Sequence, residues 1–281
     1  MESFYLTLPC SVKGIFHENV LSDYVTHLPR NIELEGKWEV ALVEFHFTKS
    51  WYNVEQEFMI GITNTAQTFH IYTTEKITPG KYTAEHLVAL INRLLSSMRT
   101  EAIEPPKVIL DQASNRVKID PGYSKKTKGQ MIFPVFDNEL FELLGLNQRI
   151  QRKNEYRIVD NEPYDDKELE SIIPMGKEVI KGPLFGERVF DAECGIHSIF
   201  IYCDVVEENL IGDSSVHCLR VCTLPQARFG ETINLTFDQP HYLPLSRRSF
   251  NTIRVTLKDK TNEQIRFQFG ETLIKLHFKK C

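Results

Sequence analysis

The most informative absences in this chain of 281 residues are spacings that common active sites require. Its nine histidines are never closer than ten residues, so the H-x-H, H-E-x-x-H and H-x-x-x-H pairs of zinc enzymes and cupins do not occur. No two of its 14 glycines stand two positions apart, which excludes a G-x-G-x-x-G loop. The motifs G-x-x-x-x-G-K-[ST] and G-x-S-x-G are also absent. We therefore expect no enzymatic activity, no metal and no cofactor.

The chain also lacks an excess of basic residues, long apolar runs and a high density of cysteines. The net charge of −5 argues against a protein that coats nucleic acid, so we expect no direct sequence-specific nucleic-acid binding. No window approaches the roughly 18 apolar residues of a membrane helix. MESFYLTLPC at the N-terminus has no basic leader or sustained apolar core, so we expect no signal peptide. Six cysteines are too few for a disulfide scaffold and favour a reduced, intracellular setting.

The closing forty residues carry the strongest pattern. Apolar and polar residues alternate over 253–258, 265–269 and 274–279, with a charged turn at 258–262 and Gly270 between the last two runs. Side chains of a strand point to opposite faces in turn, so each run has one wet and one dry face. The sequence therefore predicts a meander of three half-buried antiparallel strands, whose dry face a second layer must cover.

A further strand is predicted at 38–47, where WEVALVEFHF is apolar on both faces. Simple alternation groups Leu42 with Glu44 and His46, and Phe45 with Ala41. Such a strand is typically covered on both sides. Other predicted strands lie at 4–8, 57–63, 68–72, 189–190, 196–206, 219–224 and 232–237.

The middle of the chain changes period. Leucine and isoleucine recur at helical spacing, and with Thr83 as N-cap this predicts a helix over about 84–98. A hairpin is predicted around the turn at 111–115, and a short helix at 137–144 closed by Gly145. The segment 148–170 has dense charge of both signs and indicates a long surface loop or a partly disordered insertion.

These elements predict a mainly β protein. We interpret residues 1–281 as one single jelly-roll β-sandwich, in which the N-terminal strands form one sheet over the C-terminal meander. The helix, the hairpin and the charged loop would be an insertion within about 76–188.

A few constellations could carry chemistry. Glu44 and His46 share a predicted strand face and could relay protons, but a partly buried polar pair is the simpler interpretation. Cys218 and Cys222 are four apart, on one face of a predicted strand, with no second pair nearby, which favours structural thiols. The acidic residues within 165–170 favour a solvated loop over a cation site.

Several stretches resemble the minor capsid, or penton, protein of Polinton (Maverick) elements and the related adintoviruses. They are SFYLTLP at 3–9, the block at 24–54, SIFIYCDVVEENLIGDSSVHCLRV at 198–221, YLPLSRRSFNTIRVTLKD at 242–259 and FGETLIKLHF at 269–278. Together they cover 90 of the 281 residues, about a third of the chain, in matching order, and LPLSRRSF and LEGKWEVAL are the most specific. The charged segment at 148–187 carries no such resemblance, and its role stays open.

The resemblance implies a single jelly-roll that assembles as a homopentamer at the vertices of an icosahedral double-stranded DNA virus-like capsid. Its implied partner is a double jelly-roll major capsid protein, its implied location is the virion, and a host-surface receptor is a further possible partner. By residue type, Trp51, Tyr52, Arg247 and Arg248 are candidate contacts between subunits. Core packing is the alternative for Trp51, and a structural ion pair or a plain surface role is the alternative for the two arginines.

Two other readings remain. Jelly rolls also serve as lectins, so a glycan- or receptor-binding β-sandwich is an alternative function. A metalloenzyme of the cupin kind is a third, against which the histidine spacing argues.

Overall fold

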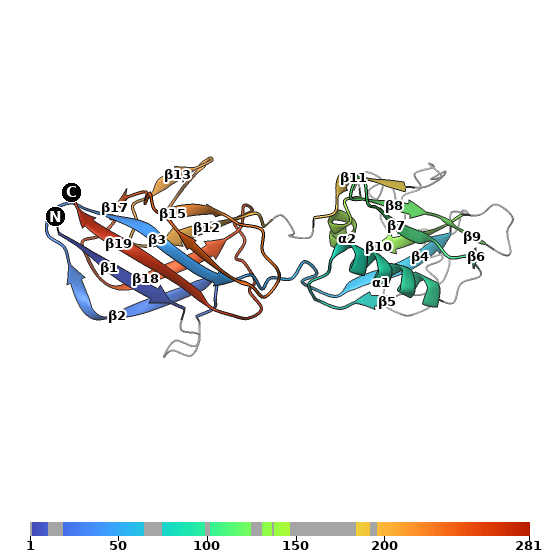
Figure 1. Cartoon of the computed structure of the whole chain (residues 1–281), viewed down its shortest axis with the longest axis horizontal. Helices are drawn as coiled ribbons and strands as arrows, with labels where there is room; N and C mark the ends of the chain where they lie inside the picture. The colour runs from blue at the N-terminus through green and yellow to red at the C-terminus, as the bar shows by residue number, and fades with distance from the viewer. Residues whose placement is uncertain are drawn as a thin grey trace, which may run out of the picture. The chain divides into compact units, whose positions relative to one another are not determined.

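The chain forms two compact units, which we describe separately. The computed structural model describes residues 2–10, 19–64, 75–98, 102–124, 131–136, 138–146, 184–191 and 196–281. The first unit combines Met1–Tyr52 with Gly195–Cys281, and the second is Asn53–Cys194 (Figure 1). The assignment of residues 1–281 to one domain with an insertion within about 76–188 stays a prediction.

The first unit is an antiparallel β-sandwich. Its main strands are β1 (Ser3–Pro9), β2 (Asp23–Glu33), β3 (Trp38–Thr48), β12 (Ser198–Cys203), β15 (Cys218–Thr223), β16 (Thr232–Thr236), β18 (Ser249–Lys258) and β19 (Thr272–Lys280). One sheet has the order β1-β19-β3-β16, with β17 (Leu243–Pro244) also paired to β3, and the other has the order β15-β12-β18-β2. A small hairpin, β13 (Asn209–Ile211) and β14 (Ser214–Val216), lies between β12 and β15.

This strand order is that of a jelly roll. Of the eight main strands in chain order, the first, third, sixth and eighth form one sheet, and the second, fourth, fifth and seventh form the other. Six of the seven connections between consecutive main strands therefore cross between sheets, and only β12–β15 stays within one, as the interlocked Greek keys of a jelly roll require. The predicted fold class, a mainly β single jelly-roll sandwich, is confirmed.

The predicted meander of three strands is wrong. Residues 249–258 and 272–280 form β18 and β19, which belong to different sheets. The segment between them is a corner held by isolated bridges, Lys258 with Gln264 and Trp51 with Phe267. Both segments alternate as predicted, but the apolar faces of β18 and β19 face each other across the core instead of lying side by side in one sheet.

The prediction that each sheet comes from one end of the chain is wrong for the same reason. β1 pairs with β19 from Ser3–Lys279 to Pro9–Leu273, and β2 pairs with β18. Each sheet therefore mixes N-terminal and C-terminal strands, and the two chain ends lie together in Figure 1. Antiparallel neighbours from opposite ends lock the first and last segments of the chain into one core.

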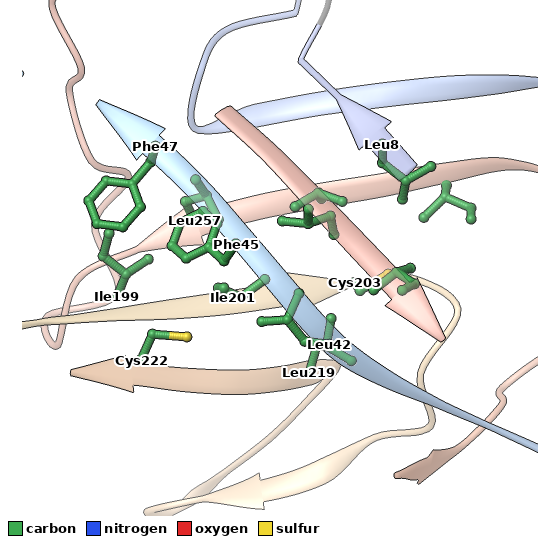
Figure 2. Close-up of a cluster of buried hydrophobic side chains, with 14 of the residues drawn as sticks. Leu8, Leu42, Phe45, Phe47, Ile199, Ile201, Cys203, Leu219, Cys222 and Leu257 are labelled. Carbon is green, nitrogen blue, oxygen red and sulfur yellow. The ribbon is translucent and has the colours of Figure 1, made fainter. Parts of the chain in front are cut away.

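A bulge in β3 corrects the predicted face assignment. Opposite β19, Lys275 pairs with Glu44 and Leu276 with Leu42, so Val43 is an extra residue on β3. A bulge of this kind shifts the alternation by one position. Leu42 therefore shares the core face with Phe45 and not with Glu44. Figure 2 shows Leu42, Phe45 and Phe47 beside Ile199, Ile201 and Leu257 of the other sheet.

The second unit is an α+β fold with its own core. Its elements are β4 (Phe58–Asn64), β5 (Glu75–Ile77), α1 (Ala84–Ser97), β6 (Ala102–Glu104), β7 (Lys107–Asp111), β8 (Arg116–Asp120), β9 (Gly122–Ser124), β10 (Met131–Phe136), α2 (Asn138–Leu143) and β11 (Leu184–Val189). They form two antiparallel sheets, β5-β4-β10-β9-β6 and β11-β8-β7. Leu87, Ile91 and Leu95 of α1 are fully buried in the apolar core of this unit.

The predicted N-cap, hairpin and short helix of the second unit are confirmed, whereas the strand predicted at 189–190 is β11 at 184–189. The Thr83 side chain accepts a hydrogen bond from the backbone N–H of His86 at 3.2 Å, as an N-cap does. The predicted hairpin is β7 with β8. After α2, the N–H of Gly145 bonds the Glu142 carbonyl and the N–H of Leu146 bonds the Phe141 carbonyl, with Gly145 at φ +71°, which is a Schellman motif. The predicted strand at 68–72 and the charged segment at 148–170 lie outside the described residues.

We expect Gly270→Ala to destabilise the sandwich strongly. Gly270 has φ +103°, and an added Cβ would overlap the Cβ and Oγ1 of Thr48. The backbone conformation alone costs about 1–2 kcal/mol for a residue with a Cβ, and the overlap adds about 1–3 kcal/mol. Gly212→Ala is the matched control, because Gly212 has φ +62° with nothing within 4 Å of its Cβ position. Denaturant melts should show the larger loss for Gly270→Ala; equal losses would contradict the overlap.

Asp23 should make the sandwich acid-sensitive. Its carboxylate accepts two hydrogen bonds from the Arg254 guanidinium, at 2.9 and 2.6 Å, and one from Thr256 at 3.1 Å. The hydrogen bond from Arg254 lowers the pKa of Asp23. A carboxylate with a lowered pKa stabilises the fold above the unfolded value of about 4, and this stabilisation is lost as the pH falls through the folded pKa.

In Asp23→Asn, unfolding midpoints should therefore fall less between about pH 6 and about pH 2 than in the unmodified protein. Asp238→Asn is the control, because Asp238 is exposed and has no partner among the described residues. If the unfolding midpoint of Asp23→Asn falls as steeply with decreasing pH as that of the control, Asp23 is not the cause of the acid sensitivity.

Candidate subunit interface

The described residues contain no metal centre that could define an active site. No group of three or more histidine, cysteine, aspartate or glutamate side chains is placed to hold an ion within this part of the chain. No helix among the described residues is long and apolar enough to cross a membrane. The candidate functional residues are therefore the four predicted subunit contacts, which we take in turn.

Trp51 lies in the core of the sandwich. Its side chain is 1% exposed and packs near Phe47 and Phe267, with ring centroids at 6.4 and 5.8 Å. It follows β3 directly, where the chain turns inward and bridges to Phe267. Of the two alternatives, core packing is what the structure shows for Trp51.

Tyr52 takes part in an aromatic cluster at the surface. Its ring stacks on Phe229 at 5.9 Å, and Phe229 meets Phe269 edge-on at 5.6 Å. Phe229 and Phe269 are 39% and 47% exposed. We call Tyr52, Phe229 and Phe269 the aromatic cluster. Exposed aromatic rings of this kind are enriched at protein interfaces.

Arg247 forms a structural ion pair. Its Nη2 lies 2.6 Å from Oδ2 of Asp204 and donates to the Thr252 carbonyl at 2.9 Å. The other carboxylate oxygen of Asp204 accepts from the backbone N–H of Arg254 at 2.9 Å. The pair thereby joins the turn after β12 to the start of β18.

Arg248 differs from its neighbour. Its side chain is exposed and has no partner among the described residues, while its carbonyl accepts from the N–H of Leu34 at 2.9 Å. The backbone is thus fixed and the guanidinium is available. A role in subunit contact stays a prediction for Arg248, as it does for Tyr52.

The structure does not bring the two predicted pairs together. Trp51 and Tyr52 follow the C-terminal end of β3, whereas the segment of Arg247 and Arg248 lies at its N-terminal end, where the Leu245 N–H bonds the Trp38 carbonyl. At about 3.3 Å per residue, an eleven-residue strand separates these ends by roughly 30–35 Å. The two predicted pairs therefore lie at opposite ends of β3.

Sequence reasoning missed two of the three rings in the aromatic cluster. Phe269 was expected on the dry face with Ile265 and Phe267, but Ile265 is buried, Phe267 is half-buried and Phe269 is exposed. The alternation fails because residues 259–271 form a corner, not a strand. Phe229 lies in the loop between β15 and β16 and carries no periodic signal.

Glu44 and His46 lie on the outer face of β3 in a charged network. Oε2 of Glu44 is 3.5 Å from Nε2 of His46, and Oε1 accepts from Lys275 at 2.8 Å. The hydrogen bond from Lys275 lowers the pKa of the Glu44 carboxyl. Nearby, His277 accepts from or donates to the Tyr242 hydroxyl at 2.7 Å and stacks on Tyr5 at 4.3 Å.

The buried cysteines are structural thiols that favour the protonated form. Burial raises the pKa of Cys203 and Cys222 to about 12 and that of Cys218 to about 11. The predicted common face of Cys218 and Cys222 is wrong. A bulge at Leu219 leaves Cys218 opposite Tyr202 and Cys222 opposite Ile199, on opposite faces of the sheet.

Comparison with known proteins gives structural similarity without sequence similarity. No family model and no curated protein matches the chain. The crystal structure of selenomethionine-labelled mavirus penton protein aligns over 100% of both chains, with 14% identity and a TM-score of 0.46. The 3.5 Å cryo-EM structure of the Sputnik virophage aligns over 100% of this chain and 98% of that chain, with 11% identity and a TM-score of 0.47. Because both TM-scores are below 0.5, the fold assignment depends on the strand order described above.

Alanine substitution should affect stability differently at Arg247 and at Arg248. Arg247→Ala removes the partner of a half-buried carboxylate and should cost about 1 kcal/mol of unfolding free energy. Arg248→Ala removes an exposed side chain and should change stability by no more than about 0.5 kcal/mol. Chemical denaturation of both variants tests this. A larger loss in Arg248→Ala than in Arg247→Ala would contradict the assignment.

Proposed function

We propose that this protein is the pentameric vertex protein of an icosahedral double-stranded DNA virus-like capsid. In this proposal it is a structural protein of the virion that sits beside a double jelly-roll major capsid protein, in an element of the Polinton or adintovirus kind. The support comes from the sequence resemblance and from where the resembling segments lie in the fold.

The observation that carries the proposal is the match between these segments and the jelly-roll unit. SFYLTLP is β1, the block at 24–54 covers β2 and β3, and the segment 198–221 begins with β12 and ends in β15. The segments 242–259 and 269–278 supply β18 and most of β19. The inserted second unit, Asn53–Cys194, contributes almost nothing to the resemblance.

The two most specific blocks also contact each other. LEGKWEVAL at 34–42 and LPLSRRSF at 243–250 are joined by the hydrogen bonds Leu34 N–H to the Arg248 carbonyl and Leu245 N–H to the Trp38 carbonyl, at 2.9 and 3.3 Å. Leu243 and Pro244 also pair with Val40 and Glu39. The two blocks are far apart in sequence but form one contact in the fold. We therefore infer that they belong to one structural feature that this chain shares with the family it resembles.

The physical properties of the sandwich suit a capsid subunit. Both sheets close over one apolar core, which makes the sandwich stiff, and the open sheet edges can accept neighbours. A cyclic pentamer uses a heterologous contact that closes on itself. Arg248 and the aromatic cluster are exposed side chains of the types that such contacts favour.

Light scattering on the purified full-length protein tests the proposal. We expect a molar mass five times that of the 32.6 kDa chain, and addition of the major capsid protein of the same element should give larger assemblies. Arg248→Ala, which should melt normally, is the variant with which to look for weaker assembly. A monomer at high concentration that does not respond to the major capsid protein would contradict the proposal.

The aromatic cluster favours one alternative, a glycan- or receptor-binding sandwich. Sugars stack on exposed aromatic rings, and Phe229 and Phe269 present such rings at the surface. A glycan array with the full-length protein tests this function, and Phe229→Ala should abolish any signal that depends on the cluster. An unchanged signal in Phe229→Ala would exclude the cluster as the binding surface.

A further inference from the structure

Among the described residues, the sheet that contains β1 has two edges with no further strand beside them, and these edges run in opposite directions. Its order is β1-β19-β3-β16, and each neighbouring pair is antiparallel. An even number of alternating strands leaves β1 and β16 antiparallel to each other. When a second copy stands beside the first with the same strand direction, β16 of one copy therefore meets β1 of the next in antiparallel orientation.

The outward backbone groups of β1 are available for pairing. The N–H of Cys10 bonds the Thr272 carbonyl and the N–H of Lys280 bonds the Glu2 carbonyl, so the even-numbered residues of β1 use their backbone groups toward β19. The N–H and C=O groups of Ser3, Tyr5 and Thr7 then point away from the sheet. These three side chains are exposed and uncharged.

The outward groups of β16 match them. The N–H of Phe237 bonds the Val43 carbonyl and the N–H of Lys49 bonds the Glu231 carbonyl, so the odd-numbered residues of β16 face β3. Thr232, Asn234 and Thr236 therefore present their N–H and C=O groups outward. Their side chains are also exposed and uncharged, and none of these groups has a hydrogen-bond partner among the described residues.

The other sheet lacks such a matching pair of edges. Its edge strand β2 contains Pro29, and its register against β18 jumps between Phe250 and Thr252, where residues 28–31 bulge out. Proline and bulges inside an edge strand block pairing there, whereas the proline of β1, Pro9, is its last residue and lies beyond the three outward positions named above. The opposite edge, β15, is itself interrupted by the bulge at Leu219. Edge-to-edge pairing between copies is thus disfavoured in this sheet and free to occur in the sheet of β1.

We propose that neighbouring copies of this protein join by antiparallel pairing of β1 with β16 of the next copy, which continues one sheet around the vertex. The inference rests on the proposed pentamer. Because β1 and β16 are different strands on opposite edges, the contact is heterologous and can close into a ring. Pairing of two β1 edges with each other would give only a two-fold dimer.

Cysteine cross-linking in the full-length protein tests the pairing. In a Cys10→Ser/Cys281→Ser background, which removes the half-exposed and the exposed thiol of the described residues, Thr7→Cys is combined in turn with Thr232→Cys, Asn234→Cys or Thr236→Cys. Paired strands place Cα atoms about 5.5 Å apart, within disulfide range. One of the three pairs should give an oxidised ladder that ends at five chains, and each single variant should stay uncrosslinked.

Lysine at the same edges gives the second measurement. Thr7→Lys and Asn234→Lys put a charge beside the open backbone groups and should each convert the pentamer to monomer, with unchanged melting of the monomer. Thr223→Lys, on the exposed edge of β15, is the matched control and should leave the pentamer intact.

The outcomes separate this inference from the proposed function. A pentamer in light scattering in which none of the three cysteine pairs cross-links overturns the strand pairing and leaves the vertex function standing. A ladder from Thr7→Cys alone would also overturn it, because it would show β1 paired with β1. A chain that never forms pentamers overturns the proposed function and this inference together.

Discussion

The burial of one apolar face between two interleaved sheets is the constraint on which the sandwich depends. Leu42, Phe45 and Phe47 of β3 face Ile199, Ile201 and Cys203 of β12 and Leu257 of β18 (Figure 2). Val40 and Val255 belong to the same core. Each fully buried aliphatic or aromatic side chain contributes roughly 2 kcal/mol. Because each sheet mixes strands from both chain ends, neither end can bury its apolar face alone.

This interleaving explains how the chain accommodates an inserted unit. The insertion leaves after β3 and returns before β12, which are strands of opposite sheets, so it replaces one crossing connection. The second unit has its own apolar core, and its first residues are tied within it by Asn53, whose side chain exchanges two hydrogen bonds with the backbone of Tyr82 at 2.8 and 2.9 Å. Among the described residues of the sandwich, no further strand pairs with the outer edge of β1 or of β16.

What the sequence predicts well is local. The Thr83 cap, the β7–β8 hairpin and the Gly145 Schellman motif depend on residues within one turn or hairpin, and the dry faces at 253–257 and 274–278 follow from alternation. Alternation predicts that one face of a strand is buried, but it does not predict which strand is its neighbour. For this reason it places 249–258 and 272–280 in one sheet, whereas the structure places them in two. The bulge at Val43 and the corner at 259–271 have no pattern of their own. Of the predicted contact residues, Trp51 is buried against Phe267 and Arg247 forms an ion pair with Asp204, and alternation could not have predicted either partner because both are distant in sequence.

Native-state hydrogen exchange on the full-length protein tests most directly whether one core unites both chain ends. Amides in the centres of β3, β12, β18 and β19 should exchange through a single cooperative opening, with the same free energy at Phe45, Ile201, Val255 and Leu276. Exchange of β19 through a separate opening of much lower free energy than that of β12 and β18 would contradict the account.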